Sequence, residues 1–470
     1  MPKEPSIFDP DSFRDSIGTI NESGDRQWVY PQKQKGKFYR KRNWASNIFL
    51  LLFFGLPFIK LHGKPLILFN ILEREFIIFG AIFRPQDLFL FALFLLTFMV
   101  FIVLFTVIFG RLFCGWACPQ TVFMEMVFRK IEYWIEGNAQ QQKALNERDW
   151  DKDKLLKKGG KIVVFFVLSF VIGNFFLSYF IGIDALIDII TQPLNQHWGG
   201  LIAMLSFAGV FFFVYSWFRE QVCIVVCPYG RLQGVLLDAN SIVVAYDYLR
   251  GEPRGKISKP TDPVQHGDCI DCNLCVRVCP TGIDIRNGTQ LECINCTLCI
   301  DACDQIMESI HKPKGLIRYA SENGIAKGQK LRLSPRMIGY SIVLLVLVTG
   351  LGFAINTRHL IDTTVLRAPG VMYQEIGADS ISNLYNYKML NKSQDTLKLH
   401  IKLLEPAGTI KFIGTEKQLN LYPGAIGEGT FFVTLHRKAI EQRKMKLQFG
   451  VFNDREEMLE TIKSVFLGPI

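Results

Sequence analysis

Five long apolar blocks, separated by polar and basic segments, dominate the pattern along this chain. A helix needs about 20 apolar residues to cross a bilayer. The pattern therefore predicts an α-helical transmembrane core of about five spans, of which the first is the shortest. The predicted spans are Trp44–Ile59, Leu88–Phe109, Lys161–Ile183, Trp198–Phe218 and Ile338–Ile355. Residues 60–85 are mixed in character and are predicted to form an outer loop that dips towards the membrane interface.

Basic residues beside the apolar blocks predict how the chain lies in the membrane. They gather in the N-terminal arm (1–43), in segment 129–161 and in segment 312–336, whereas loop 184–197 has no Lys or Arg. Because cytoplasmic loops carry an excess of basic residues, we expect these three segments inside and residues 359–470 outside. The chain begins with polar residues and no early apolar stretch, so no cleaved signal peptide is expected.

The part of the chain after the last apolar block follows a two-residue period. In Thr396–Leu403, Leu397, Leu399, Ile401 and Leu403 fall on one face, as in a half-buried strand. Gly429–Leu435 and Met445–Phe452 are predicted to form further strands. A small β-sandwich of about a hundred residues accounts for this pattern.

Composition narrows the function further. The formal charge is +10, but Lys and Arg sit beside the apolar blocks rather than in a basic module with interleaved aromatic residues, so no nucleic acid is expected. All 12 Cys lie between Cys114 and Cys303 and fall in spaced motifs. Cysteines grouped in this way, in a long chain that is not a small secreted domain, favour metal ligation over disulfides.

Eight of these cysteines follow the spacing of a two-cluster bacterial ferredoxin. Cys269, Cys272, Cys275 and Cys279 form a C-x2-C-x2-C-x3-C run ending in Pro280, and Cys293, Cys296, Cys299 and Cys303 repeat it. In that arrangement the fourth Cys of each run crosses to the other [4Fe–4S] cluster. One cluster is therefore predicted to take Cys269, Cys272, Cys275 and Cys303, and the other Cys293, Cys296, Cys299 and Cys279. The alternative, a pair of structural zinc sites, fits less well, since zinc motifs usually combine two close ligands with two distant ones.

The remaining four cysteines form a repeated C-x3-C-P motif at the ends of two spans. The motifs are Cys114–Pro119 and Cys223–Pro228. Proline is disfavoured inside a helix but suits its first position, so each motif is predicted to lie at a junction between two helices. A new helix N-terminus there would lower the thiol pKa. Four soft thiolates suit Cu(I), and the alternative is that Cys114, Cys118, Cys223 and Cys227 are ordinary buried cysteines.

Some motifs are absent. There is no dinucleotide-binding G-x-G-x-x-G between a strand and a helix, no P-loop and no C-x-x-C-H for covalent haem. Because no nicotinamide or flavin site is recognisable, the electrons are expected from a reduced partner or from quinol.

These motifs together resemble the cytochrome c oxidase accessory proteins called CcoG, FixG or RdxA, a family of membrane-bound polyferredoxins. The resemblance covers nearly the whole chain. It rests on Gly110–Thr121, on Val226–Arg231, on the ferredoxin segment Cys269–Cys303, which includes Thr281–Gly288, and on the β tail. It implies a multi-domain protein of the bacterial inner membrane, with a ferredoxin-like α+β domain in the cytoplasm and an immunoglobulin-like β-sandwich in the periplasm. The expected division is 1–43 (arm), 44–250 (transmembrane core), 251–320 (ferredoxin), 321–357 (linker and last helix) and 358–470 (β domain).

The resemblance also implies an activity. The family assists assembly of cbb3-type oxidase by reducing Cu(II) to Cu(I), which would make this chain an oxidoreductase, a cupric reductase. Cys114, Cys118, Cys223 and Cys227 would then be the residues at which copper is handled. The partners implied are the lipid bilayer, copper, a copper chaperone or transporter, and oxidase assembly factors, with a homodimer left open. Two alternatives remain: a quinol dehydrogenase subunit similar to NapH-type proteins, and a non-enzymatic scaffold whose clusters only stabilise the fold.

Overall fold

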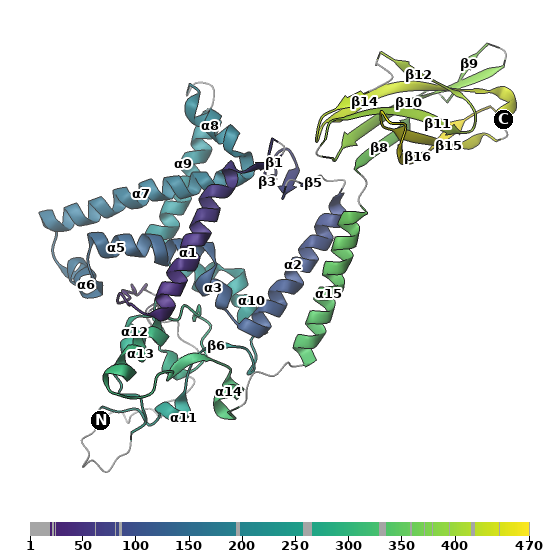
Figure 1. Cartoon of the computed structure of the whole chain (residues 1–470). Helices are drawn as coiled ribbons and strands as arrows, with labels where there is room; N and C mark the ends of the chain where they lie inside the picture. The colour runs from purple at the N-terminus through teal and green to yellow at the C-terminus, as the bar shows by residue number, and fades with distance from the viewer. Residues whose placement is uncertain are drawn as a thin grey trace. The chain divides into compact units, whose positions relative to one another are not determined.

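The structure is a computed structural model of the 470-residue chain (Figure 1). It describes residues 19–469 apart from 21, 22, 24, 62, 80, 84–86, 194–197, 257–265, 329–334, 358, 359, 371, 378, 394, 415–418 and 441. Lys330 and Arg332 of the third basic segment, and residues 1–18 of the arm, therefore lie outside the described residues. The chain divides into two units. The first comprises Met1–Leu56, Phe94–Ser178 and Ile183–Val348, and the second Pro57–Leu93, Tyr179–Gly182 and Thr349–Ile470.

Within the described residues, four helices are long and apolar enough to cross a membrane. They are α2 (Leu88–Phe109), α7 (Lys152–Ile181), α9 (Trp198–Phe213) with its π-helical continuation η6 (Val214–Phe218), and α15 (Pro335–Asn356). Each coincides with a predicted span, and the protein is a membrane protein. α7 begins nine residues before the predicted Lys161, because its basic first turns continue the same helix.

The first predicted span stays a prediction. Trp44–Ile59 falls in α1 (Lys37–Gly55) and the short 3-10 turn η2 (Leu56–Phe58), and α1 is not among the spanning candidates of the described chain. Its first turns are basic, so only Trp44–Gly55 is apolar helix. At about 1.5 Å per residue this part is about 18 Å long, short of a hydrocarbon core of about 30 Å.

Residues 60–85, expected to form a loop, contain short strands instead. β1 (Lys60–Leu61) pairs with β2 (Lys64–Pro65), and an antiparallel sheet follows in the order β3-β4-β5. The sheet consists of β3 (Ile67–Asn70), β4 (Glu75–Ile78) and β5 (Ala81–Phe83). Leu68 and Ile77 face each other across it and are buried, which is why this mixed sequence forms strands.

Short helices surround each C-x3-C-P motif in the first unit. The first motif lies on α3 (Leu112–Trp116) and at the start of α4 (Pro119–Thr121), followed by the π-helix η4 (Val122–Phe128), α5 (Arg129–Ile135) and α6 (Ala139–Glu147). The second lies on the π-helix η7 (Val222–Val226) and at the start of α10 (Pro228–Leu236). π-helical turns are rare and often mark functional sites. α8 (Ile183–Thr191) precedes α9.

The ferredoxin part of the first unit is small and is closed by a pair of strands. β6 (Val243–Tyr246) pairs antiparallel with β7 (Ile317–Ala320). Between and after them lie α11 (Tyr248–Gly251), α12 (Leu274–Arg277), η8 (Ile285–Asn287), α13 (Leu298–Ser309) and α14 (Glu322–Ala326). Val244, Tyr246, Met307 and Ile317 form the buried core between the strands and α13, together with several of the cysteines.

The second unit contains an immunoglobulin-like β domain of two sheets (Figure 1). One sheet has the order β12-β14-β10-β8, with β9 beside β10, and the other β13-β11-β15-β16. The strands are β8 (Ile361–Arg367), β9 (Gln374–Ile376), β10 (Ser380–Asn391), β11 (Leu397–Glu405), β12 (Thr409–Ile413), β13 (Leu419–Leu421), β14 (Ile426–His436), β15 (Lys444–Phe452) and β16 (Met458–Leu467). The three predicted strands fall in β11, β14 and β15. Leu399 and Ile401 are buried as the alternation predicts, in a core with Tyr385, Phe431 and Phe449.

Candidate functional site

The two ferredoxin-type cysteine runs adopt the same local backbone. On each side of the second cysteine, one residue has a left-handed conformation: Asp271 and Asn273 in the first run, Asn295 and Thr297 in the second, with φ between 52° and 67°. Asn and Asp tolerate this conformation better than most residues. The paired left-handed residues bend each C-x2-C-x2-C segment into a loop before its third cysteine enters a helix, α12 or α13.

Four cysteines line a first cavity in the ferredoxin part. They are Cys269, Cys272 and Cys275 from the first run and Cys303 from α13. Cys272 is exposed, whereas Cys269 and Cys275 are buried. The structure thus brings together the four residues predicted for one cluster, including the fourth that crosses from the other run.

A second cavity is lined by the other predicted set. Its walls include Cys293, Cys296 and Cys299 from the second run and Cys279 from the first. Cys275 of the first set also touches this cavity, so the two cavities are neighbours. The assignment of individual ligands stays a prediction, but the grouping in space is the one that the spacing predicts.

The chemistry of both cavities fits iron–sulfur clusters. Burial raises the pKa of Cys275, Cys296 and Cys303 to about 12, so these thiols hold their protons at neutral pH in the protein alone. Bound iron reverses this preference, because a coordinating thiol is deprotonated by the metal. Among the described His, Cys, Asp and Glu, no group of three is arranged to hold a single metal ion. Cavities lined by four cysteines suit a larger, multi-atom centre.

The four cysteines of the C-x3-C-P motifs also lie together. Cys114 is on α3 and Cys223 on η7, while Cys118 and Cys227 are the N-caps of α4 and α10, each followed by proline at the first helical position. This is the junction that the sequence predicts. Cys223 interacts electrostatically with the other three, and the Cys227 sulfur accepts a hydrogen bond from the Gly230 N–H at 3.4 Å.

The predicted lowering of the thiol pKa at these junctions is wrong. Burial raises the pKa of Cys114 to about 11 and that of Cys223 to about 12, and the pKa of Cys118 also rises. Hydrogen bonds from the backbone lower the pKa of Cys118 but do not outweigh its burial. α4 continues without a break into η4 and α5, so Cys118 does lie at a helix N-terminus, but the favourable effect of that terminus is smaller than the cost of burying a thiolate.

The paired cysteines pack against the second cavity. Cys114 shares a buried core with Ile294 and Cys296. The next residue, Gly115, lies so close to the second run that a Cβ built on it would be 2.4 Å from the Ile294 carbonyl oxygen. α3 therefore rests directly on the backbone between Cys293 and Cys296.

Two buried arginines flank this contact, and the sequence did not reveal their role. Arg42, which belongs to the basic N-terminal arm, is only 1% exposed and donates from Nε to the Gly115 carbonyl at 2.7 Å. Arg111 is also buried, and its Nε donates to Gln233 Oε1 at 3.3 Å, the oxygen that the Cys114 thiol also contacts. The only sequence signal was the position of Arg111, three residues before Cys114.

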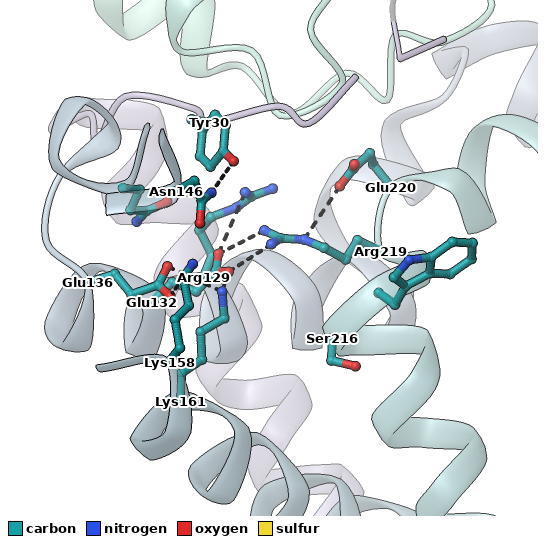
Figure 2. Close-up of polar contacts among 12 residues, drawn as sticks. Tyr30, Arg129, Glu132, Glu136, Asn146, Lys158, Lys161, Ser216, Arg219 and Glu220 are labelled. Carbon is teal, nitrogen blue, oxygen red and sulfur yellow. Dashed lines mark hydrogen bonds and ion pairs between the residues drawn. The ribbon is translucent and has the colours of Figure 1, made fainter. Parts of the chain in front are cut away.

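A network of buried ion pairs surrounds Arg219, which lies four residues before Cys223 (Figure 2). Arg219, which precedes η7, donates both terminal nitrogens to Glu132 of α5, at 2.7 and 2.8 Å. Lys161 of α7 contacts the same carboxylate at 2.7 Å, and Lys158 contacts Glu136 at 2.8 Å. These cations hold the pKa of the Glu132 carboxyl well below its usual range, although burial alone would raise it. The basic segment 129–161 is thus partly a buried structural element.

Three stretches of the chain match models of known families. A 4Fe–4S binding domain matches residues 91–138, which include Cys114 and Cys118, and a 4Fe–4S dicluster domain matches residues 218–322. The IG-like fold found at the C-terminus of FixG matches residues 351–469. A solved structure of a FixG-related protein from Vibrio parahaemolyticus matches 24% of this chain and all of its own length, at 16% identity and a TM-score of 0.21.

The fold and the cysteine cavities define a membrane-bound iron–sulfur protein of the polyferredoxin class, with an immunoglobulin-like domain. Protein RdxB of Cereibacter sphaeroides is 34% identical to this chain over 81% of it and 83% of the relative. RdxA of the same organism is 32% identical over similar shares, and the nitrogen fixation protein FixG of Rhizobium meliloti is 31% identical over 83% of this chain and 82% of its own. The chain belongs to the family of FixG, RdxA and RdxB.

Proposed function

We propose that this protein passes single electrons from its ferredoxin part to copper at the paired cysteines, reducing Cu(II) to Cu(I) for assembly of a cbb3-type oxidase. One observation carries the proposal: α3, the helix of Cys114, rests on the loop between Cys293 and Cys296. The second cysteine cavity of the ferredoxin part and the paired cysteines, which offer soft ligands, are thus in direct packing contact. The copper step and the oxidase follow from the family resemblance.

The ferredoxin-type cysteines and the paired cysteines have different roles in this proposal. Bound clusters supply one-electron chemistry at the two cysteine cavities. Reduction of Cu(II) to Cu(I) consumes one electron, so each reduced cluster accounts for one Cu(I). Cys114, Cys118, Cys223 and Cys227 offer soft sulfur ligands, which prefer Cu(I). Because burial keeps the Cys114 and Cys223 thiols protonated, copper binding must release protons from them.

The partners and the orientation belong to the same proposal. The electron donor is a reduced soluble protein or quinol, and the exposed Cys272 gives a soluble donor access to the first cavity. Cu(I) then passes to a chaperone, a transporter or an assembly factor of the oxidase. The excess of basic residues beside the spans favours an orientation in the inner membrane with the ferredoxin part in the cytoplasm and the β domain in the periplasm.

A stoichiometric assay tests the copper step. The full-length protein is purified anaerobically in detergent, its iron content is measured, and it is reduced and freed of excess reductant. It is then mixed with Cu(II) and a Cu(I)-specific chelator. We expect one Cu(I) per reduced cluster, and a large loss of rate in Cys114→Ser/Cys118→Ser at unchanged iron content. Ala117→Ser is the matched control, because it adds a hydroxyl to the same motif and keeps both thiols.

The outcome separates the alternatives. No Cu(I), or the same rate with and without the paired thiols, contradicts the copper proposal. If oxidation of the reduced protein by a quinone analogue is fast while Cu(II) is inert, the protein is a quinol-linked electron carrier. If oxidase maturation in cells survives Cys272→Ser with the clusters lost, electron transfer is not the function, and the scaffold alternative is favoured.

A further inference from the structure

Arg42 and Arg111 bury positive charge beside the second cysteine cavity. They are 1% and 3% exposed. Within the part of the chain that the structure describes, Arg42 Nη2 and Arg111 Nη1 have no hydrogen-bond acceptor. A buried guanidinium nitrogen without a partner is costly, so an anionic group is expected within its reach.

The surroundings of both arginines indicate which group this is. Arg42 donates to Gly115, and Gly115 contacts Ile294 and Asn295 of the second run. Gly110, the neighbour of Arg111, lies against Asn295 as well. Arg111 Nε and the Cys114 thiol share Gln233 Oε1, and Cys114 packs against Cys296 in one buried core. Glu292, the neighbour of Cys293 in the sequence, is partly exposed, so water screens its charge.

The first cavity has a different electrostatic environment. Its nearest arginine, Arg286, is paired with Asp284 at 2.6 Å and with Asp271 at 2.5 Å. Asp304 adds negative charge next to Cys303. Cys272 is exposed, so water screens charges near it. Among the described residues that line the first cavity, Arg286 is the only cation, and two carboxylates offset its charge.

We propose that Arg42 and Arg111 raise the reduction potential of the cluster held by Cys279, Cys293, Cys296 and Cys299 above that of the other cluster. Net charge, hydrogen bonds to sulfur and solvent exposure set the potential of such a cluster. Reduction adds one negative charge, and two buried cations stabilise it. The electron of a singly reduced protein then resides next to Cys114, at the end of the relay nearest the paired cysteines. This inference rests on the proposed electron transfer and gives it a direction.

The test is a redox titration followed by electron paramagnetic resonance, in the full-length protein without copper. Cys272→Ser removes or alters the paramagnetic signal of the cluster in the first cavity. Comparison with the wild type then shows which of the two midpoints belongs to which cluster. In the wild type, the second cavity is expected to have the higher midpoint. Arg42→Gln and Arg111→Gln are each expected to lower that midpoint and leave the other in place. Arg42→Lys is expected to retain most of the wild-type value, because it keeps the charge.

Controls distinguish electrostatic tuning from a change in fold. Arg231→Gln removes an exposed cation of α10 and is expected to move neither midpoint. The iron content shows whether each variant retains its clusters. If Arg42→Gln does not retain iron, the midpoints of Arg111→Gln and Arg42→Lys test the inference instead. Equal midpoints in the wild type, a reversed order, or arginine variants with unshifted midpoints overturn the inference. Because no copper is present, failure here is distinct from failure of the chelator assay.

Discussion

Glu132 lies where three cations converge, and replacing it by Gln should destabilise the first unit strongly. The carboxylate is 1% exposed and contacts Arg219 through two hydrogen bonds and Lys161 at 2.7 Å, with Arg129 at 3.8 Å. Removing one partner from a buried ion pair typically costs about 3–5 kcal/mol, because the other charge stays buried without compensation. Here several cations lose the same partner, so we expect the upper part of that range.

The matched control is Glu147→Gln. Glu147 pairs with Lys143 at 3.9 Å, but both side chains are about two-thirds exposed. An exposed pair of this kind contributes about 0–1 kcal/mol. Each variant removes one carboxylate, and the two carboxylates lie on neighbouring helices. The difference between their unfolding midpoints therefore reports the effect of burying the ion pairs.

Thermal unfolding in detergent, followed by circular dichroism, measures the effect. Glu132→Gln should lower the midpoint clearly, and Glu147→Gln should leave it near the wild-type value. Adding Arg219→Gln to Glu132→Gln should recover part of the loss, because it removes one of the stranded cations. The stabilising role of the ion network is contradicted if Glu132→Gln has the same unfolding midpoint as Glu147→Gln. It is also contradicted if the midpoint of Glu132→Gln/Arg219→Gln falls by the full sum of the two single effects.

Three further expectations follow from the same contacts. The pKa of Glu132 is depressed in the folded protein, so its stabilisation is complete well above the ordinary value of 4.5 and is lost as the pH falls towards the folded pKa. The gap in unfolding midpoint between the wild type and Glu132→Gln should therefore narrow below about pH 4.5. Gly115→Ala should cost about 1–3 kcal/mol and loosen iron retention, because the new Cβ meets backbone at 2.4 Å. Gly159→Ala, with open space around its Cβ, should be neutral or slightly stabilising in the same thermal assay. Cys303→Ser should alter the same paramagnetic signal as Cys272→Ser; altering the other signal would contradict the crossed ligand set.

Patterns that depend on neighbouring residues could be predicted from the sequence. The C-x2-C-x2-C spacing specifies a loop, and the grouping of Cys303 with the first run follows from the two-cluster pattern. Likewise, the alternation at Leu399 and Ile401 requires only the two-residue period of a strand. The spacing and the alternation are signals within a few residues, whereas the grouping of Cys303 with the first run comes from the two-cluster motif as a whole.

Features that depend on packing between distant segments were missed. Arg42 looks like a topology signal in the sequence, because a basic arm next to an apolar block usually remains in water. Its burial depends on a contact with Gly115, 73 residues away. Similarly, the pKa of Cys223 follows from how deeply the junction is buried rather than from the helix that begins after it. Local patterns carry no information about burial of this kind.

The buried arginines connect the stability of the fold to its cofactors. In a protein without clusters, Arg42 and Arg111 would keep guanidinium nitrogens away from both water and an acceptor, which is unfavourable. A negatively charged centre at Cys293 and Cys296 offsets that cost, so its binding free energy adds to the stability of the contact between α3 and the second run. The same charges stabilise the reduced centre further. The contact that places the paired cysteines next to the ferredoxin part should therefore be tightest when an electron is available for transfer.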